Sequence, residues 1–463
     1  MDSLSEQDGV WREIAALTWP QLLTLMCQFV IGMTDVWTAG QMGPEIQASM
    51  GLITQCQVFL MMLCMATVSG AVASVSQSLG GGKMDRARRY VGLVCTGAIL
   101  AGTFVALLAF CLRGPLLALL RTPEAIMPAA LMFFNVTMWA LPGHYGMAIC
   151  SAMFRSAKAV SRPLCVMLGS VALNVIGDLG FGLGWWGLPA FGARGIAWST
   201  CLSVNLGAAV LLFWLWKDGL LTRVSWPRWR WVRQGGPYLL RVTVPALATS
   251  ALWQTGYLVL FIITASLPEG RVPALAGLTA GLRIEGLLFM PAVAFGMTGG
   301  VLSGRSLGRA DSAGARRIAR HILVIGCGTM SLVGAGLWPA RHILAAFLTP
   351  DPSVQIQTVS YLTYNILAVP FSVASIILSG VFNGSGATVY PMRAFSLSVW
   401  CVRLPLAWYL GHVLWRSASG VFMAMLVSQA VQSMCLLLVF LFCDWTRFSM
   451  RSMSASRART GRL

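Results

Sequence analysis

The chain is a series of apolar stretches, each long enough to cross a lipid bilayer. A membrane-spanning helix needs about 20 mostly apolar residues, because each residue advances the helix by about 1.5 Å. Hydrophobic residues make up 57% of the 463 residues and charged residues only 10%. Soluble domains carry about 25% charged residues. The sequence therefore predicts an all-α polytopic membrane protein rather than a soluble globular domain.

Twelve such stretches can be placed along the chain, and an even number puts both termini on the same side of the membrane. The predicted spans lie near residues 14–39, 48–77, 90–112, 126–149, 163–184, 194–216, 238–265, 273–302, 319–338, 354–380, 391–411 and 418–443.

The basic residues indicate the orientation. With a cytoplasmic N-terminus, 25 of the 33 Lys and Arg residues fall in cytoplasmic loops and tails, six fall on the opposite side, and Arg283 and Arg403 lie inside spans. Because cytoplasmic loops are enriched in Lys and Arg, both termini are expected in the cytoplasm, and the protein in a bacterial-type cytoplasmic (inner) membrane. The net charge of +18 then reflects topology, with anionic lipids and not nucleic acid as the counterpart.

The chain also repeats itself at a constant shift in the numbering. The segment SLGGGKMDRARR at 78–89 matches SLGRADSAGARR at 306–317, and the same shift relates Pro142 to Pro370. A constant shift of this kind indicates a duplication. Six spans per copy place both copies in the same orientation, as in two-lobed carriers.

The duplication predicts two pseudo-symmetric six-helix lobes. We expect an N-terminal lobe over 1–216, a cytoplasmic linker over 217–237, a C-terminal lobe over 238–443 and a basic cytoplasmic tail over 444–463.

Few charged residues lie inside the predicted spans, and two of them are acids in the first half, Asp35 and Asp178. An acidic side chain at bilayer depth costs about 2.5–3.5 kcal/mol or more, so it is expected to have a protein partner and a function. Asn174 lies one helical turn before Asp178 and shares its helix face. Thr200 in the sixth span can add a hydroxyl group. A structural hydrogen-bonding role remains the alternative for these side chains.

Two carboxylates, an amide and a hydroxyl are hard oxygen ligands that suit a sodium ion, and a carboxyl group in apolar surroundings can equally carry a proton. At the shift that relates Pro142 to Pro370, Asn174 and Asp178 correspond to Val402 and Leu406. A requirement of helix packing would be expected in both copies. We therefore assign ion coupling to the N-terminal half.

The remaining polar residues inside spans are candidates for a substrate cavity. Arg283 and Glu285 are two apart in one helix and point in different directions, so they are not expected to pair. Glu285 either joins an ion network with another helix or contacts substrate. Arg403 is expected to be a snorkelling or structural residue. The cavity candidates are Gln28, Gln254, Arg283 and Glu285.

The twelve cysteines and four histidines show neither disulfide nor metal-ligand spacing. No cofactor is expected, and no metal other than a coupling sodium ion at Asp35, Asn174, Asp178 and Thr200. A membrane-embedded enzyme would need a nucleophile–base pair or a metal site, and the sequence offers neither pattern.

Several motifs, in their order and duplication, resemble the multidrug and toxic compound extrusion (MATE) family over about residues 12–443. The motifs are Pro20 with Asp35 and Gly40, the repeated SLG segments, FRSAKAVSRP with FNGSGATVYP, LNVIGD in the fifth span and GARGIAWST before the sixth.

This resemblance implies two six-helix lobes around a V-shaped cavity, and export of amphipathic, often cationic compounds in exchange for sodium ions or protons. It also implies that Asp35, Asn174 and Asp178 bind the coupling ion and that Thr200 matches a hydroxyl ligand. Other members use an acid in the seventh helix, where this chain offers only Gln254.

We therefore expect a cation-coupled antiporter that exports drugs and toxic compounds by alternating access between two lobes. A site between lobes of one chain makes a monomer sufficient. A flippase or exporter of a lipid-linked precursor or of a specific metabolite is the alternative. A flippase would need several cations in its cavity to hold a diphosphate.

Overall fold

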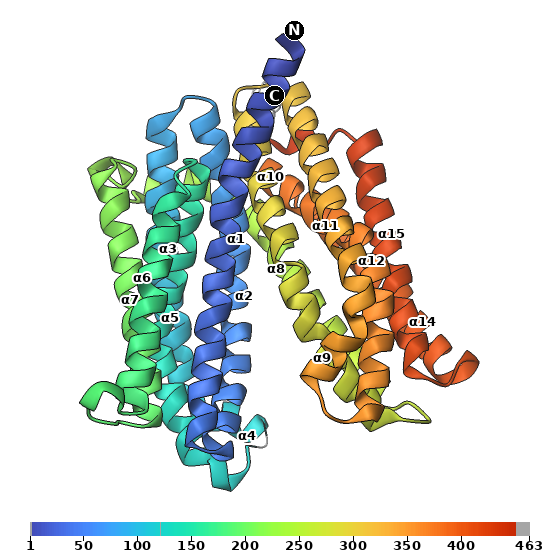
Figure 1. Ribbon diagram of the computed structural model, residues 1–463. Helices are drawn as coiled ribbons and strands as arrows, with labels where there is room; N and C mark the ends of the chain where they lie inside the picture. The colour runs from blue at the N-terminus through green and yellow to red at the C-terminus, as the bar shows by residue number, and fades with distance from the viewer. Residues whose placement is uncertain (1, 121, 451–463) are drawn as a thin grey trace. The chain divides into compact units, whose positions relative to one another are not determined.

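The computed structural model describes residues 2–120 and 122–450, with side chains from residue 9 onward. Within these residues every regular element is a helix (Figure 1). The predicted all-α class is confirmed.

The chain divides into two compact units. The N-terminal unit is Trp19–Leu240, and the C-terminal unit combines the residues up to Thr18 with those from Arg241 onward. The segment that ends at Thr18 therefore groups with the second half of the chain, unlike the predicted lobe over 1–216. One contact behind this grouping is a hydrogen bond of 3.0 Å between the hydroxyl groups of Thr18 and Thr298.

Helix α1 starts in the C-terminal unit and crosses into the N-terminal unit after Thr18, and the helices that follow belong to the N-terminal unit. Together these helices are α1 (Asp2–Met42), α2 (Pro44–Gly80), α3 (Met84–Cys111), α4 (Arg113–Leu119), η1 (Glu124–Ile126), α5 (Met127–Ser156), α6 (Ser161–Gly177), η2 (Asp178–Gly182), η3 (Trp185–Gly187), α7 (Ala193–Lys217) and η4 (Arg223–Ser225).

The remaining helices belong to the C-terminal unit, except that α8 begins in the N-terminal unit and enters the C-terminal unit at Arg241. Several of them are short segments of one span. The helices of this group are α8 (Trp229–Ala265), α9 (Arg271–Leu288), α10 (Met290–Gly308), α11 (Ser312–Leu348), α12 (Pro352–Ser385), α13 (Val389–Ser396), η5 (Leu397–Arg403), α14 (Leu404–Trp408), η6 (Tyr409–Leu414), α15 (Ala418–Phe442) and η7 (Trp445–Phe448).

Twelve predicted spans are found. Eleven helices of the described chain are long and apolar enough to cross a membrane, and α9 with α10 forms a twelfth that is bent by 45°. The bend lies at Phe289, just before Pro291 in the first turn of α10. Proline lacks an N–H group and disrupts the preceding turn, so the span expected to run unbroken over 273–302 is broken here.

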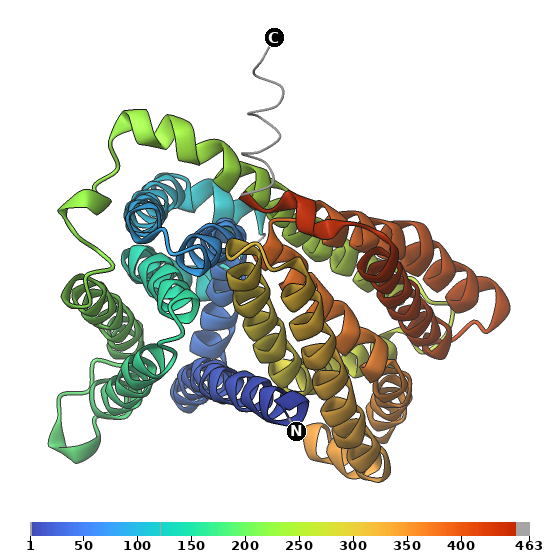
Figure 2. The same ribbon diagram turned by 90° about the horizontal axis from the view of Figure 1, so that it is seen from above.

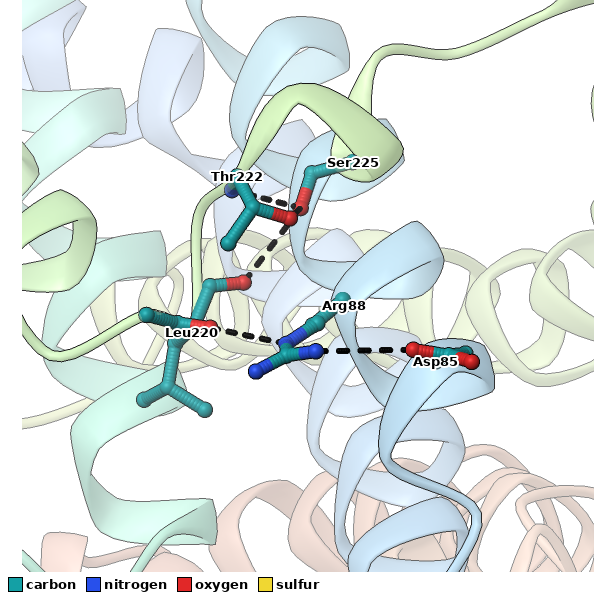
Figure 3. A network of polar contacts seen from close by, with 6 residues as sticks. Asp85, Arg88, Leu220, Thr222 and Ser225 are labelled. Atoms are coloured by element: carbon teal, nitrogen blue, oxygen red, sulfur yellow. Dashed lines mark hydrogen bonds and ion pairs between the residues drawn. The ribbon is translucent and has the colours of Figure 1, made fainter.

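The predicted linker over 217–237 is anchored on the N-terminal unit. Arg88 on α3 donates a hydrogen bond of 2.8 Å to the carbonyl oxygen of Gly219 and also contacts Asp85 (Figure 3). The backbone N–H of Thr222 donates to the hydroxyl oxygen of Ser225, which closes the short turn η4. These bonds hold the segment after α7 against α3.

The second part of this linker is helical, because α8 begins at Trp229 rather than at the predicted residue 238. The ring of Trp231 packs edge-to-face on Tyr90, and the amide of Gln77 donates to the hydroxyl of Tyr238 at 3.0 Å. Figure 2 shows this light-green segment beside the blue helices α2 and α3. Of the predicted tail, η7 is described, and residues 451–463 lie outside the described residues.

Each unit is built around one central helix. In the N-terminal unit α5 packs against α2, α3 and α7, and in the C-terminal unit α12 packs against α9, α10, α11 and α15. The two central helices correspond in the duplication and carry the matched prolines Pro142 and Pro370.

Two turns have the same backbone conformation in both copies of the duplication. The turn before α3 places Gly82 at φ 68°, and the matching turn before α11 places Ala310 at φ 69°. In the same way, Lys158 has φ 65° where Gly386 has φ 85°. Left-handed residues are uncommon outside glycine, so their recurrence shows that both copies keep one backbone pattern.

Helices α10 and α12 cross through glycines. A Cβ atom added at Gly380 would meet the backbone of Gly296, and one added at Gly384 would meet the backbone of Gly300. Each helix thus presents a pair of glycines four residues apart. Small residues allow such close approach, and dispersion at the contact replaces the hydrophobic force that lipid cannot supply.

This crossing predicts a stability effect. Gly384→Ala is expected to destabilise the protein by about 1–3 kcal/mol, because the methyl group overpacks a backbone contact that cannot shift cheaply. Thermal unfolding of the purified protein in detergent measures the change. Gly328→Ala on α11 is the matched control, since a Cβ there meets nothing within 4 Å. Equal melting temperatures for the two variants would contradict the role of the crossing.

Candidate functional site

Asp35 lies at the centre of a polar cluster inside the N-terminal unit. The side-chain amide of Asn174, at the end of α6, donates to Oδ1 of Asp35 at 3.2 Å. The hydroxyl of Thr200 on α7 lies 3.2 and 3.3 Å from the two carboxylate oxygens of Asp35. The same amide nitrogen of Asn174 lies 3.0 Å from Oγ1 of Thr200. Three helices therefore contribute to one site.

Asp178 completes the cluster. It is fully buried, and the polar side chains that act on its carboxylate are those of Asp35 and Ser199, neither of which forms a hydrogen bond of ordinary geometry with it. The charged group that acts on it is the carboxyl group of Asp35. Two neighbouring carboxylates cannot both stay ionised in an apolar interior without a cation or a shared proton. Either a cation or a shared proton would therefore relieve the repulsion between the two carboxyl groups.

The backbone at Asp178 departs from a regular α-helix. Asp178 directly follows Gly177 and begins η2, a single π-helical turn, and such turns are frequent at functional sites. Gly177 faces Ser199, whose hydroxyl donates to the backbone oxygen of Asn174 at 2.9 Å. A side chain at Gly177 would collide with Ser199, so this glycine lets α6 and α7 approach closely enough to share the site.

The ligand atoms of this cluster are oxygens. The oxygen atoms come from the carboxylates of Asp35 and Asp178, the backbone carbonyl of Asn174 and the hydroxyl groups of Thr200 and Ser199. The side-chain oxygen Oδ1 of Asn174 has no hydrogen-bond partner in the part of the chain described. Hard oxygen atoms suit an alkali cation, and the paired carboxyl groups suit a proton.

A pocket opens beside Asp35 and Thr200. Its walls come from α1, α2, α5 and α7, all within the N-terminal unit. The lining combines apolar and polar side chains: Met50, Ile53, Thr54, Gln57, Phe133, Thr137, Ala140, His144, Ala197 and Cys201.

Three of the four predicted cavity residues do not join a described pocket or cluster. Gln28 and Arg283 are exposed, and Gln254 is half-buried. Glu285 is different. It is buried, and the hydroxyl group of Tyr361 on α12 donates to its carboxylate. Gly281, one turn before Glu285, leaves the space that the ring of Tyr361 occupies.

Arg403 belongs to the same cluster of the C-terminal unit. Its side chain is only 2% exposed, so of the two expected roles, snorkelling or structural, the structural one agrees with the observed position. Its Nε donates to the hydroxyl of Ser428 at 2.8 Å, and its guanidinium lies 5.7 Å from the ring centre of Tyr257. Arg403 also acts on the charge of Glu285. The cluster is a buried network that joins five spans.

The two units carry corresponding pockets. A pocket in the C-terminal unit is lined by Glu285, Tyr361, Asn365 and Ala368, among others. In the duplication, these four positions match lining residues of the N-terminal pocket: Gln57, Phe133, Thr137 and Ala140. Between α7 and α15 the shift that relates the two copies is three residues shorter than elsewhere. With this shorter shift, Ala197, Thr200 and Cys201 match Phe422, Met425 and Leu426.

Several residues of these sites were not predicted. Ser199 gives no signal of its own beyond its place next to Thr200. Gln57 and Tyr361 could have been found from the duplication, because Gln57 occupies the position of Glu285. His144 is one of the four histidines whose spacing indicates no metal site. Its place in the pocket depends on which face of α5 points inward.

Comparison with known proteins agrees with this architecture. The sequence matches the MatE family over residues 20–179 and 245–409, which covers both copies of the duplication. A probable multidrug resistance protein NorM of Thermotoga maritima is 26% identical over 96% of this chain and 94% of its own length. The multidrug resistance protein PmpM of Pseudomonas aeruginosa is 23% identical over 87% of this chain and 84% of its own.

Solved structures share the fold. A mutant of the Vibrio cholerae MATE transporter VcmN superposes with a TM-score of 0.87 at 19% identity, covering 94% of this chain and 97% of that one. A transporter of the MOP superfamily from Pyrococcus furiosus gives a TM-score of 0.85 at 16% identity, covering 94% of this chain and 96% of that one. With the family match spanning well over half of its residues, this multi-pass membrane protein belongs to the MatE family, the multidrug and toxic compound extrusion transporters.

Proposed function

We propose that the protein is a cation-coupled antiporter that exports amphipathic or cationic drugs and toxic compounds by alternating access. The observation that carries this proposal is the cluster of Asp35, Asn174, Asp178 and Thr200, in which two buried acids face one another without a positive charge. In this proposal the four residues bind the coupling ion, which is Na⁺ or H⁺. No organic cofactor takes part.

Energy for export comes from inward movement of the ion. One charge moving through 100 mV releases about 2.3 kcal/mol. Ion binding neutralises the facing carboxyl groups and stabilises the conformation of the N-terminal unit in which α1, α6 and α7 are closed on the site. Drug and ion then favour different conformations, and each weakens the binding of the other by the same factor.

The substrate class rests on the relatives. NorM of Thermotoga maritima and PmpM of Pseudomonas aeruginosa are named multidrug resistance proteins, which supports small drugs as substrates here. Within this chain, the substrate contacts that we propose are Gln28, Gln254, Arg283 and Glu285. The Glu285 pocket supplies aromatic rings from Tyr361, Tyr364 and Phe422, which suit a flat organic cation.

The distribution of basic residues supports both termini in the cytoplasm and a place in the bacterial inner membrane, where cytoplasmic loops contact anionic lipids. One chain contains a full pair of units, so a monomer is sufficient for transport. Nucleic acid has no role in this proposal, and neither has enzymatic turnover.

A flippase or exporter of a lipid-linked precursor is disfavoured by Arg403. Its guanidinium is buried and bonded to Ser428, so it cannot hold a diphosphate. Among the described residues that the sequence places inside spans, Arg283 is then the one exposed cation, and a diphosphate would need several. Export of a single specific metabolite remains compatible with the site. Measuring how many different compounds are transported distinguishes this alternative from multidrug export.

Removing either acid is expected to abolish ion-driven export. Proteoliposomes containing a fluorescent cationic dye are given a sodium gradient or a pH gradient, and dye movement is compared for wild type, Asp35→Asn and Asp178→Asn. Each variant is expected to lose at least about tenfold in rate, because an amide cannot neutralise a bound cation or carry its proton. Asp85→Asn, at an exposed position in the first turn of α3, is the control. Wild-type rates in both site variants would refute the ion site.

Substitutions of Thr200 distinguish Na⁺ from H⁺ as the coupling ion. If Na⁺ drives export, Thr200→Val is expected to raise the sodium concentration for half-maximal rate about tenfold, because one coordinating oxygen is lost. Thr200→Ser keeps the hydroxyl and is expected to stay near wild type. A proton needs no coordination shell, so proton-driven export would show no such difference between the two variants.

Glu285 tests the substrate assignment. Glu285→Gln keeps the side-chain shape but removes the charge, and the KM for a cationic dye is expected to rise about tenfold while the sodium or proton dependence is unchanged. Tyr361→Phe, which keeps the carboxylate, is the matched variant, with thermal unfolding as the check on folding. An unchanged KM in Glu285→Gln would remove this residue from the cavity.

A further inference from the structure

The pocket of the C-terminal unit contains a side chain to which the proposed function gives no role. Asn365 lies on the central helix α12, which packs against α9 and α15 (Figure 1). It lines the same pocket as Glu285 and is only 8% exposed. Its side-chain oxygen Oδ1 has no hydrogen-bond partner among the described residues. Buried amide oxygens normally accept a hydrogen bond, so this atom indicates a donor that comes from outside the chain.

The other arm of the Asn365 amide is already in use. Asn365 acts through a hydrogen bond on the carboxylate of Glu285. An ionised carboxylate can only accept, so the amide faces it with its NH₂ group. The carbonyl oxygen of an amide lies on the opposite arm from the NH₂ group. Oδ1 is therefore an acceptor that is held in one direction, away from Glu285.

The negative charge of Glu285 is also compensated within the unit. The hydroxyl group of Tyr361 donates to the carboxylate. Arg403 acts on the charge of Glu285 from a buried position, in which its Nε donates to Ser428. An entering cation is attracted by Glu285 and repelled by Arg403, and both forces are the same for every monovalent cation at the same place. Charge alone therefore does not distinguish one organic cation from another, whereas the unpaired oxygen of Asn365 does.

We propose that Asn365 is a specificity-determining residue of the Glu285 pocket, and that this pocket selects protonated amines, which carry an N–H group, over quaternary ammonium ions. The N–H group donates to Oδ1 of Asn365, the positive charge lies near Glu285, and the flat part of the molecule contacts the rings of Tyr364 and Phe422. This inference rests on the proposed substrate pocket at Glu285 and names the class of cation that the pocket takes.

The physical reason is the cost of an acceptor that is covered but not bonded. A quaternary ion displaces water from the pocket and offers no hydrogen, so Oδ1 of Asn365 stays buried and unpaired. Sites built to hydrogen-bond a ligand discriminate strongly against analogues that lack the group. Gln429 on α15 lines the same pocket but is half-buried, so water can satisfy its amide with either ligand.

The corresponding position of the N-terminal pocket differs in chemistry. Thr137 on α5 occupies the place of Asn365 in the duplication. A hydroxyl group rotates and serves as donor or acceptor, whereas an amide oxygen only accepts. The selection for an N–H group is therefore expected in the C-terminal pocket and not in the N-terminal one.

The test measures binding of two matched cations to the purified full-length protein in detergent at about pH 7. The first is N,N-dimethyl-(2-naphthylmethyl)amine, which is protonated at this pH and carries one N–H group. The second is (2-naphthylmethyl)trimethylammonium, which has the same ring and the same charge but a methyl group in place of that hydrogen. We expect wild type to bind the protonated amine about tenfold more tightly than the quaternary ion.

Variants of α12 assign this preference to one atom. Asn365→Leu keeps a side chain of similar size but removes the acceptor. It is expected to weaken binding of the protonated amine about tenfold and to leave binding of the quaternary ion unchanged, so that the preference disappears. Thr363→Val is the matched control, because its hydroxyl bonds to the backbone of its own helix and it does not line the described pocket. This control is expected to follow wild type, and thermal unfolding checks that both variants are folded.

The outcomes separate this inference from the proposed function. Equal binding of the two cations by wild type overturns the role of Asn365, and so does a preference that survives in Asn365→Leu, since the added methyl group would then explain it. An equal loss for both cations in Asn365→Leu shows a merely structural residue and also overturns the inference. In each of these cases weaker binding of both cations by Glu285→Gln leaves the substrate pocket standing. If Glu285→Gln binds both cations as wild type does, or if wild type binds neither, the pocket and the inference built on it both fail.

Discussion

The N-terminal unit depends on a carboxyl group that cannot be buried alone. Asp35 is only 9% exposed, and an isolated charge in such surroundings would destabilise the fold by several kcal/mol. Asn174 and Thr200 donate hydrogen bonds to it, which fixes the positions of α6 and α7 relative to α1. Gly177 permits the close approach that these bonds need. Packing and charge therefore act on the same three helices, and a change in the occupancy of the site must be felt by all of them.

The two units solve one packing problem with different polar residues. Both place a proline-containing helix at the centre, and both use left-handed turns at Gly82 and Ala310 before the next span. Their polar clusters differ. In the N-terminal unit the acids face each other, whereas in the C-terminal unit Glu285 is bonded to Tyr361 and lies near Arg403. The first cluster lacks a positive charge and the second contains one, which is why ion binding is assigned to the first.

Much of this fold follows from the sequence, because long apolar segments and a duplication of six spans leave few arrangements open. The grouping of Asp35 with Asn174 and Asp178 also followed, since buried charges are rare and i, i+4 residues share a helix face. What could not be foreseen depends on which side of each helix faces inward. For Arg403 the sequence left two roles open, snorkelling or structural, and the side chain lies in a buried network. The same limit hid the pairing of His144 with Gln57.

The match between the two pockets has an evolutionary consequence. A six-helix ancestor that worked as a pair of identical subunits would have carried the same residue in both pockets. A mutation from amide to acid would then have changed both at once. Fusion of the copies into one chain removes that constraint, so position 57 can be glutamine while position 285 is glutamate. Gene fusion thereby allowed one pocket to specialise without altering the other.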